Sequence, residues 1–446
     1  DPKISFGTLL GGNTYDFASD VAVDAKGNFY VVGYTEANTR FPGFGDGYVS
    51  KFSPTGALIY TTFLVGSFGE DARAIAVTPA GIAFVGGSTT SRDFPRVGAF
   101  QSTYAGDGDG YIVKLAVNGT IMKSSFIGGS GRDAVNGVRL GKGPNMTNGL
   151  YLIGTTESRN FPKKNALQQQ YGGGRQDGFL SIIHSVQFQL LFSTYVGENA
   201  TDDIKSLALI NSGDLYALNV APDSSLVSSI IHFIPQGSGT NMQYPARLVT
   251  DYRWEISPLG QALKFATLTE YNHQAAITAG LDPSSTNDIA ALVLATVCIA
   301  QGSNCTDNGS LIFFNKDVTR ISSINFGGTG PGAYFVNDIA IGKDGSIYMV
   351  GDTLIKNLPV VNPIQATNKG SWDGFILALT PGTFQPKFYS YLGAAAGDFA
   401  LGVAVDNSGN ILVAGSTESK QFPTTPNAPK KKPTGTGDGY VVKITP

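Results

Sequence analysis

The sequence predicts an all-β fold built from a repeated unit, and three observations support this prediction. Glycine, tyrosine and phenylalanine number 57, 19 and 27 of the 446 residues, which favours many short strands joined by tight turns. A landmark of Asp-Gly followed by an aromatic residue recurs along the chain. Each copy runs directly into a strand-length apolar segment. Such self-similarity predicts several copies of one structural unit.

The landmark sets the length of the unit. Its clear copies start at Asp46, Asp109, Asp177, Asp373 and Asp438. We interpret Asp251-Tyr252 as a weaker copy, and the long gap before Asp373 predicts a hidden copy at residues 310–314. The spacing is then about 65 residues. The predicted units are 1–56, 57–119, 120–186, 187–260, 261–318, 319–382 and 383–446.

Each unit contains four strand-length runs, which we name A to D in chain order. The first set consists of residues 21–24, 28–33, 47–52 and 57–64, and its D run opens the next sequence unit. Gly27 ends the turn between A and B, and Pro54 and Gly56 lie between C and D, where turns favour these residue types. Four short antiparallel strands at a long fixed period are typical of a β-propeller blade. We expect A to be innermost because it is small and apolar.

The two ends of the chain predict how the ring closes. The chain opens on a D-type run, residues 4–12, and ends on a C-type run, residues 440–444. We therefore expect a single domain, 1–446, with seven blades, in which the N-terminal strand completes the last blade. This pairing removes two free strand edges.

Several of these segments resemble the SBBP family of seven-bladed β-propeller repeat proteins. The pattern is carried by residues 389–393, 402–406, 409–417, 422–423 and 438–443. It is close in five units and poor between about residues 200 and 320. The resemblance implies a propeller and a secreted or surface setting. It implies no reaction, because no catalytic residues are shared across the family.

Composition excludes several function classes. Lys and Arg number 31 against 34 Asp and Glu, a net charge of -3, so nothing favours binding to nucleic acid. The longest apolar run, residues 289–300, is too short for a membrane-spanning helix. His184, His232 and His273 lie in different units without metal-ligand spacing. We expect no catalytic residues, no metal and no cofactor.

A secreted protein is predicted from three features. The chain starts at Asp1 rather than Met, which is typical of a processed N-terminus. Cys298 and Cys305 lie close together and are predicted to form a disulfide; the alternative is two buried or free thiols. Five sequons are candidate glycosylation sites: Asn118, Asn145, Asn199, Asn304 and Asn308.

The connections between strands predict which face binds. The D–A and B–C connections emerge on one face and contain most of the loop length, as binding loops do. We expect the Phe-Pro pairs of the B–C connections to fill gaps between blades rather than touch a ligand. The better candidates break the repeat: residues 221–249, 301–309 and 426–436. Lys430, Lys431 and Lys432 are possible partner-binding residues; the alternative is a solvated loop.

Acidic residues occupy one matching place before the A runs. They are Asp16, Glu70, Asp133, Asp202 and Asp398. They could ring one mouth of the channel and hold a cation or polarise a substrate. Alternatively, they accept hydrogen bonds from loop N–H groups and neighbouring blades.

Two hypotheses for function follow. The first is a secreted or cell-surface, non-catalytic scaffold that binds proteins, glycans or copies of itself, as in an extracellular filament or coat. The second is a polysaccharide lyase or hydrolase with carboxylates at the loop-rich mouth. Propellers host both classes, so the fold alone does not decide between them.

Overall fold

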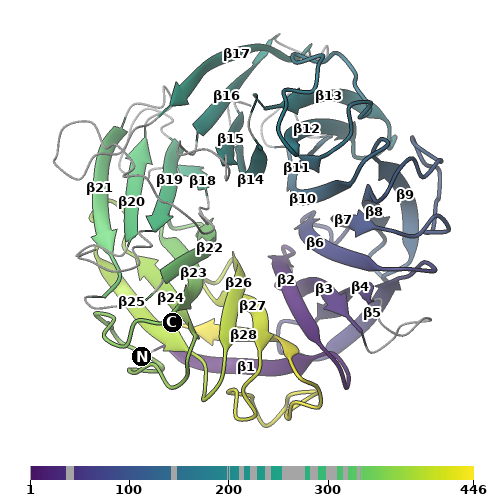
Figure 1. Ribbon diagram of the computed structural model, residues 1–446. Coiled ribbons are helices and arrows are strands. Elements are labelled where there is room, and N and C mark those ends of the chain that lie inside the picture. The colour runs from purple at the N-terminus through teal and green to yellow at the C-terminus, as the bar shows by residue number, and fades with distance from the viewer. Residues whose placement is uncertain are drawn as a thin grey trace.

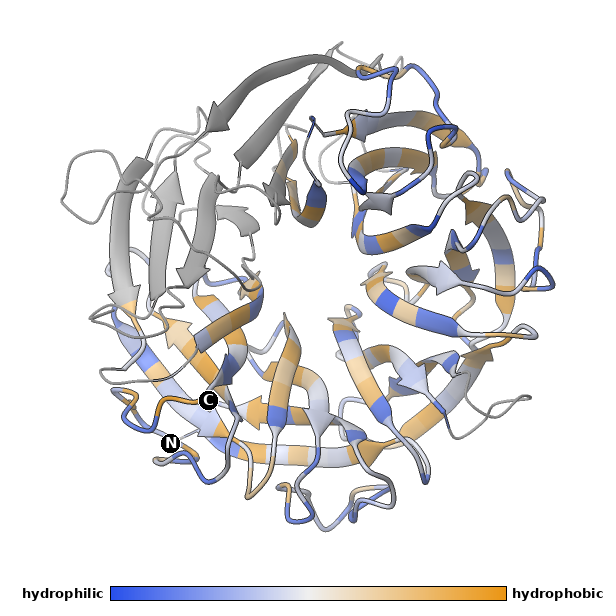
Figure 2. Ribbon diagram, in the orientation of Figure 1, coloured by the Kyte–Doolittle hydropathy of each residue, from blue (hydrophilic) through white to orange (hydrophobic). Residues whose placement is uncertain are grey.

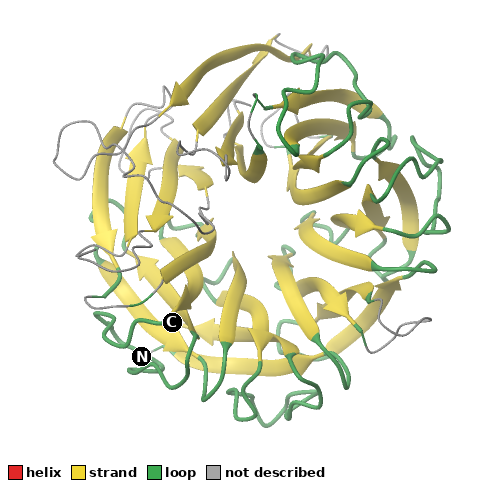
Figure 3. Cartoon of the chain, viewed as in Figure 1, coloured by secondary structure: helices red, strands yellow, loops and turns green. Residues whose placement is uncertain are grey.

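In the computed structural model, β-sheets form a closed ring around a central axis (Figure 1). The structure describes residues 2–36, 45–141, 148–197, 199, 201–209, 215–220, 229–236, 243–253, 277–281, 290–297, 309–314, 320–328, 332 and 334–446. Within these residues every element is a strand (Figure 3), and seven four-stranded antiparallel sheets make the blades of a propeller. This part of the chain contains no helix long and apolar enough to span a membrane.

Blades 1 to 3 each run from an inner A strand to an outer D strand. Blade 1 consists of β2 (Asp16–Val23), β3 (Phe29–Thr35), β4 (Asp46–Phe52) and β5 (Leu58–Leu64). Blade 2 consists of β6 (Glu70–Val77), β7 (Ala83–Thr89), β8 (Asp109–Leu115) and β9 (Ile121–Ile127). Blade 3 consists of β10 (Asp133–Leu140), β11 (Gly149–Thr156), β12 (Asp177–His184) and β13 (Leu190–Val196).

Blades 4 to 6 follow the same strand order. Blade 4 consists of β14 (Asp203–Leu209), β15 (Leu215–Val220), β16 (Ser229–Gln236) and β17 (Gln243–Arg253). Blade 5 consists of β18 (Ile277–Leu281), β19 (Ala290–Val297), β20 (Gly309–Phe314) and β21 (Arg320–Phe326). Blade 6 consists of β22 (Tyr334–Ile341), β23 (Ile347–Thr353), β24 (Asp373–Leu379) and β25 (Pro386–Leu392).

Blade 7 joins the two ends of the chain. It consists of β26 (Asp398–Val405), β27 (Ile411–Thr417), β28 (Asp438–Thr445) and, from the N-terminus, β1 (Lys3–Leu10). The antiparallel register pairs Lys3 with Thr445 and Leu10 with Gly439, so β1 runs along the whole of β28 (Figure 1). The predicted closure of the ring is confirmed.

The A strands lie around the axis, as their small residues predict. Each A strand contacts the A strands of both neighbouring blades. In β26, a Cβ atom built on Gly402 would lie 2.9 Å from the Cα atom of Asp20 in β2. Because no larger residue fits so close to the neighbouring backbone, glycine is needed where the inner strands of blades 7 and 1 meet.

In blades 1 and 7 the A–B turn is built by an aspartate and a glycine. In blade 1 the Asp24 carboxylate accepts hydrogen bonds from the backbone N–H groups of Lys26 (2.9 Å) and Asn28 (3.0 Å). Gly27 between them has φ 80°, the left-handed conformation that glycine adopts without strain. The predicted turn is therefore set by local sequence.

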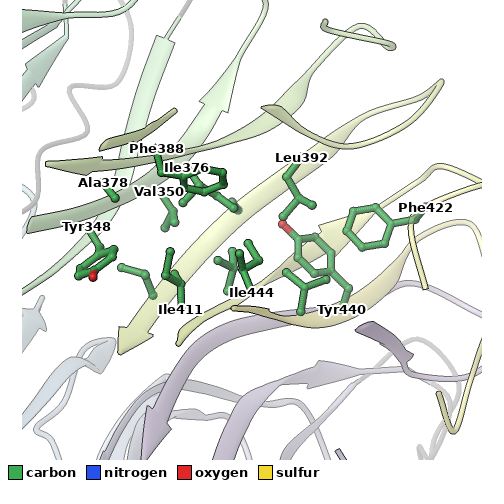
Figure 4. Close-up of a cluster of buried hydrophobic side chains, with 14 of the residues drawn as sticks. Tyr348, Val350, Ile376, Ala378, Phe388, Leu392, Ile411, Phe422, Tyr440 and Ile444 are labelled. Carbon is green, nitrogen blue, oxygen red and sulfur yellow. The ribbon is translucent and has the colours of Figure 1, made fainter. Parts of the chain in front are cut away.

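The hydrophobic core lies between adjacent blades. Side chains alternate across each strand, so the B and C strands face a neighbouring blade on both sides. One cluster joins Val350 and Ile376 of blade 6 to Ile411 and Ile444 of blade 7 (Figure 4). Hydrophobic residues are accordingly concentrated in the strands, whereas the loops are more hydrophilic (Figure 2).

Blade 4 departs from the predicted repeat. Asp251-Tyr252 does not start a third strand; both residues lie in β17, where Tyr252 pairs with Ile230 of β16. The C strand, β16, starts at Ser229 without an Asp-Gly landmark, which is why its position was predicted wrongly. Residues 221–249 are consequently not one insertion, because they contain β16 and part of β17. The unit predicted as 187–260 likewise spans β13 to β17.

Blade 5 contains the hidden copy where it was predicted. Residues 310–314 lie in β20, the C strand of this blade, which pairs with β19 and β21. The connection from β19 to β20 is a B–C connection, and Cys298 and Cys305 within it lie outside the described residues.

Candidate binding site

In four blades part of the B–C connection lies along the outer D strand, and we call this part the cap. The caps are residues 95–101 in blade 2, 162–168 in blade 3, 359–365 in blade 6 and 423–430 in blade 7. In blade 2, the backbones of Val97 and Ser124 exchange two hydrogen bonds of 3.2 and 3.0 Å. In blade 7, Thr425 N–H donates to the Gly7 carbonyl at 2.9 Å. The caps therefore satisfy backbone groups at the outer edge.

One residue near the end of each cap fixes it to the blade. These residues are Gln101, Gln168, Gln365 and Lys430. In blade 6, the Gln365 Nε2 group donates to the Asp373 carboxylate at 2.7 Å, and Gln365 Oε1 accepts from Gly393 N–H at 3.0 Å. The side chain thus ties the cap to the C strand and to the end of the D strand.

Lys430 does the same in blade 7 with an ammonium group. Its Nζ atom forms an ion pair with the fully buried Asp438 and donates to the carbonyls of Gly11 (3.0 Å) and Gly12 (3.2 Å). The structure therefore places Lys430 inside the blade, whereas Lys431 and Lys432 are exposed. Partner binding by the lysines stays a prediction, and only Lys431 and Lys432 have free ammonium groups for it among the three.

The Phe-Pro pairs fill gaps between blades, as predicted. Phe94, Phe161 and Phe422 are buried. The ring of Phe422 lies 4.2 Å, centroid to centroid, from that of Tyr440 in the C strand (Figure 4). Phe94 belongs to a cluster that includes Val49 of blade 1 as well as residues of blade 2. These phenylalanines support the caps and are not available to a ligand.

A second aromatic residue follows the cap in blades 2 and 3. The ring of Tyr104 meets that of Phe126 edge-on, at 5.7 Å and 76°. The ring of Tyr171 meets that of Tyr195 in the same way, at 5.9 Å and 89°. Phe126 and Tyr195 occupy the same position in the two D strands, and each is at most 1% exposed.

Blade 1 differs from the four capped blades, because its B–C connection is about half as long. It comprises residues 36–45, whereas those of the capped blades are 90–108, 157–176, 354–372 and 418–437. The B–C connections of blades 4 and 5, residues 221–228 and 298–308, are short as well. The Phe-Pro pair is retained, but the residues that form a cap elsewhere are missing from the sequence. Among the described residues, β5 has no bridge of the kind that Val97 makes with β9.

The outer strand of blade 1 is correspondingly exposed. Leu58 is 49% exposed and Phe63 is 40% exposed. Phe63 pairs with Tyr48 as Phe126 pairs with Tyr111, so it occupies the position that is fully buried in blade 2. Exposed apolar side chains gathered on one strand are typical of an interaction surface.

A groove of about 400 Å³ lies beside this strand, between blades 7 and 1. We call it the rim groove. Its walls come from β1, β4, β5 and the end of the blade 7 cap, with Leu9, Tyr48 and Phe63 among the apolar residues and Lys430 at the cap. It is large enough for a few side chains of a peptide. The rim groove is the candidate binding site.

Sequence reasoning missed Phe63 and its neighbours, although a signal was present. The distance from Thr35 to the Asp46 landmark is about half that in the other well-matched units. The longer B–C connections cover the outer strands of their blades, and the sequence does not show this. Without that knowledge, a shortened connection does not predict an exposed outer strand.

The centre of the ring contains a smaller polar cavity of about 110 Å³, lined by Asp20, Arg73, Arg139 and Asp338 among others. The Asp20 carboxylate accepts from Ile75 N–H of the next A strand at 2.9 Å, and Asp338 accepts from Val403 N–H at 2.8 Å. Burial and the charge of Asp338 raise the pKa of Asp20 to about 7. These carboxylates bridge adjacent blades. The described residues include no cluster of three metal-ligating side chains.

The acidic residues before the A strands do not ring a mouth of the channel. Asp16, Asp133 and Asp398 are buried, and Glu70 accepts from Gly66 N–H at 2.7 Å. The others whose contacts are resolved accept from the residue four positions earlier in the same way: Asp16 from Gly12, Asp133 from Gly129 and Asp398 from Ala394. Asp202 is also buried. The predicted alternative, hydrogen bonding to loop N–H groups, is correct.

Burial shifts the ionisation of these carboxyls. It raises the pKa of Glu70 to about 7 and those of Asp133 and Asp398 to about 6, although hydroxyl and N–H donors oppose the shift. The cause is desolvation, which disfavours the charged form. Their contacts make these residues structural links between strands.

The remaining predicted residues are only partly described. Asn118 and Asn199 are exposed, so their amide groups are accessible for glycosylation, which stays a prediction. Asn145, Asn304, Asn308, Cys298 and Cys305 lie outside the described residues. His184 accepts hydrogen bonds from the backbone of its own C–D turn.

Comparison with known proteins supports the repeat. The family model of the SBBP beta-propeller repeat matches residues 6–39 and 388–423. These segments contain most of β1 and β25 and all of β2, β3, β26 and β27, on either side of the point where the ring closes. No curated protein matches the chain.

Three solved structures are similar to the chain at low identity. A Dyadobacter fermentans protein of unknown function is 10% identical, with 100% of this chain and 99% of that chain covered and a TM-score of 0.41. YCF48 bound to D1 peptide is 9% identical (99% and 94% covered, 0.43), and Penicillium chrysogenum α-L-arabinanase with arabinobiose is 11% identical (78% and 93%, 0.45). Similarity this distant carries no information about activity. The chain is thus a β-propeller protein, two segments of which match the SBBP repeat.

Proposed function

We propose that the chain is a non-catalytic scaffold, secreted or at the cell surface, that binds another polypeptide at its rim groove. The observation that carries this proposal is the exposed apolar strand β5 beside a groove of about 400 Å³. Rigid blades on both sides hold the groove open without a partner, so binding does not require the protein to rearrange.

The secreted setting is the part of the proposal that the sequons support. Asn118 lies in the exposed turn between β8 and β9, and Asn199 is exposed before β14. A self-associating filament or coat is one form that such a scaffold could take, with the rim groove as the contact between copies.

The alternative of a polysaccharide lyase or hydrolase lacks its proposed carboxylates. Asp133 and Asp398 were candidates for that chemistry, and both are buried and accept hydrogen bonds from loop N–H groups. A glycosidase needs two carboxyl groups that face a substrate cleft.

The test is selection of binding peptides from a random library displayed on phage, followed by measurement of their affinities for two variants. We expect the enriched peptides to bind the wild-type protein and to lose at least tenfold in affinity for Phe63→Lys, because a charge in the groove opposes burial of apolar side chains.

Met122→Lys is the matched control, because Met122 is 43% exposed on the capped D strand β9 while Phe63 is 40% exposed on β5. Peptides that bind both variants equally, or the absence of any enriched peptide, would contradict the proposal. Release of reducing ends from a panel of polysaccharides would instead favour the enzyme.

A further inference from the structure

We infer that the occupant of the rim groove is an extended strand of a partner protein that replaces the missing cap of blade 1 and inserts an aromatic side chain. This inference rests on the proposed function and specifies the chemistry of its partner. The chain itself provides the template, since blades 2 and 3 show what covers the equivalent surface.

The backbone of the outer strand β5 can pair with a partner strand. β5 is the last strand of its sheet, and Thr61 in it corresponds to Ser124 in β9, since they pair with Ser50 and Val113 at matching places of the C strands. Ser124 exchanges two hydrogen bonds with the cap residue Val97. An incoming strand can make the same antiparallel bridge at Thr61, which is the strand-addition mode of peptide recognition.

The ring of Phe63 can be covered by an aromatic side chain of the partner. In blade 2 the D-strand residue Phe126 is covered edge-on by Tyr104, which follows the cap by three residues. In blade 1 the equivalent Phe63 is 40% exposed and lines the groove. A tyrosine or phenylalanine of the partner can therefore pack against Phe63, a contact that adds affinity beyond the buried area.

The exposed lysines that follow the blade 7 cap favour an acidic partner. β5 contains no charged residue, and the blade 7 cap that walls the groove continues into the exposed Lys431 and Lys432. Lys430 is held by Asp438, so the free positive charge nearest to this wall along the chain is that of the two exposed lysines that follow it. An acidic residue next to the aromatic residue of the partner is favoured by this charge.

The probe is a fluorescent peptide that contains residues 95–104 of this chain, PRVGAFQSTY, followed by two aspartates. Fluorescence anisotropy should show saturable binding to the wild-type protein, with a Kd below about 100 µM. Replacing Tyr104→Ser in the peptide should weaken binding at least tenfold. N-methylation of the Val97 nitrogen, which removes the donor of the bridge, should do the same.

Charge is tested with the double variant Lys431→Ala/Lys432→Ala. It should bind the peptide at least threefold more weakly at low salt and no differently at high salt. Analytical ultracentrifugation without peptide tests whether a second copy of the chain is the occupant. In that case the wild type would form a dimer that Phe63→Lys does not form. This outcome would overturn the proposal of a separate partner.

The proposed function and this inference can fail separately. If library peptides bind the groove but the cap peptide does not, or if it binds equally without its tyrosine and its bridging N–H group, the inferred partner chemistry is wrong. If neither kind of peptide depends on Phe63, the proposed function is wrong as well.

Discussion

Removal of residues 1–11 should abolish cooperative folding of the isolated chain at room temperature. The deletion takes β1 out of blade 7 and exposes the core around two buried residues, Phe6 and Leu9. Phe6 packs against the rings of Phe29 and Phe52 in blade 1, so the strand also joins the first and last blades. Losing one buried Phe and one buried Leu costs about 5 kcal/mol or more, which is comparable with the whole stability of a domain.

Thermal unfolding followed by circular dichroism measures this effect. A synthetic peptide of residues 1–12 should restore the transition when added in trans, whereas the same peptide with Phe6→Ser and Leu9→Ser should not. A truncated chain that unfolds at the wild-type temperature would show that closure by β1 is dispensable.

Lys430→Ala should destabilise the protein by about 3–5 kcal/mol, because it leaves the carboxylate of Asp438 buried without its ion pair. Lys431→Ala and Lys432→Ala are the matched controls. Both side chains are exposed, so each change should stay within about 0.5 kcal/mol of the wild type. Urea unfolding measures all three free energies under the same conditions.

Lys430→Gln should recover a large part of the loss, because Gln365 donates to Asp373 from the equivalent position of blade 6. Equal effects of alanine at positions 430 and 431 would mean that Lys430 does not fix the cap. Lys430 and Gln365 would then contribute differently to the free energy of unfolding, although they occupy the same position in their blades.

Most of the architecture could be predicted because it is encoded locally and repeatedly. The turn at Asp24 to Gly27 and the Asp-Gly landmarks recur at a near-constant spacing, and the types of the first and last strands predict closure. Prediction failed in blade 4, where the C strand starts at Ser229 without a landmark and the nearest acidic-aromatic pair belongs to the D strand.

The site was harder to predict because it depends on the short B–C connection of blade 1, which leaves the strand β5 exposed. The sequence shows the long connections but not that they lie along the outer strands, since no residue pattern around Val97 indicates that it pairs with Ser124. Lys430 was taken as a surface residue for the same reason. Its role in fixing the cap depends on its contact with Asp438, which corresponds to the contact of Gln365 with Asp373 in blade 6.

The central claim is that blade 1 binds a partner strand because its B–C connection is too short to form a cap like that of blade 2, and a graft tests it most directly. Residues 43–44 are replaced by residues 96–107 of blade 2, which lengthens the connection to that of a capped blade. A graft of the same length made of glycine and serine is the control.

Binding of the PRVGAFQSTYDD peptide to both grafts is measured by fluorescence anisotropy. We predict that the cap graft loses at least tenfold in affinity while the glycine-serine graft binds like the wild type. Unchanged binding to a correctly folded cap graft would contradict the account, because the peptide would then not occupy the place of a cap.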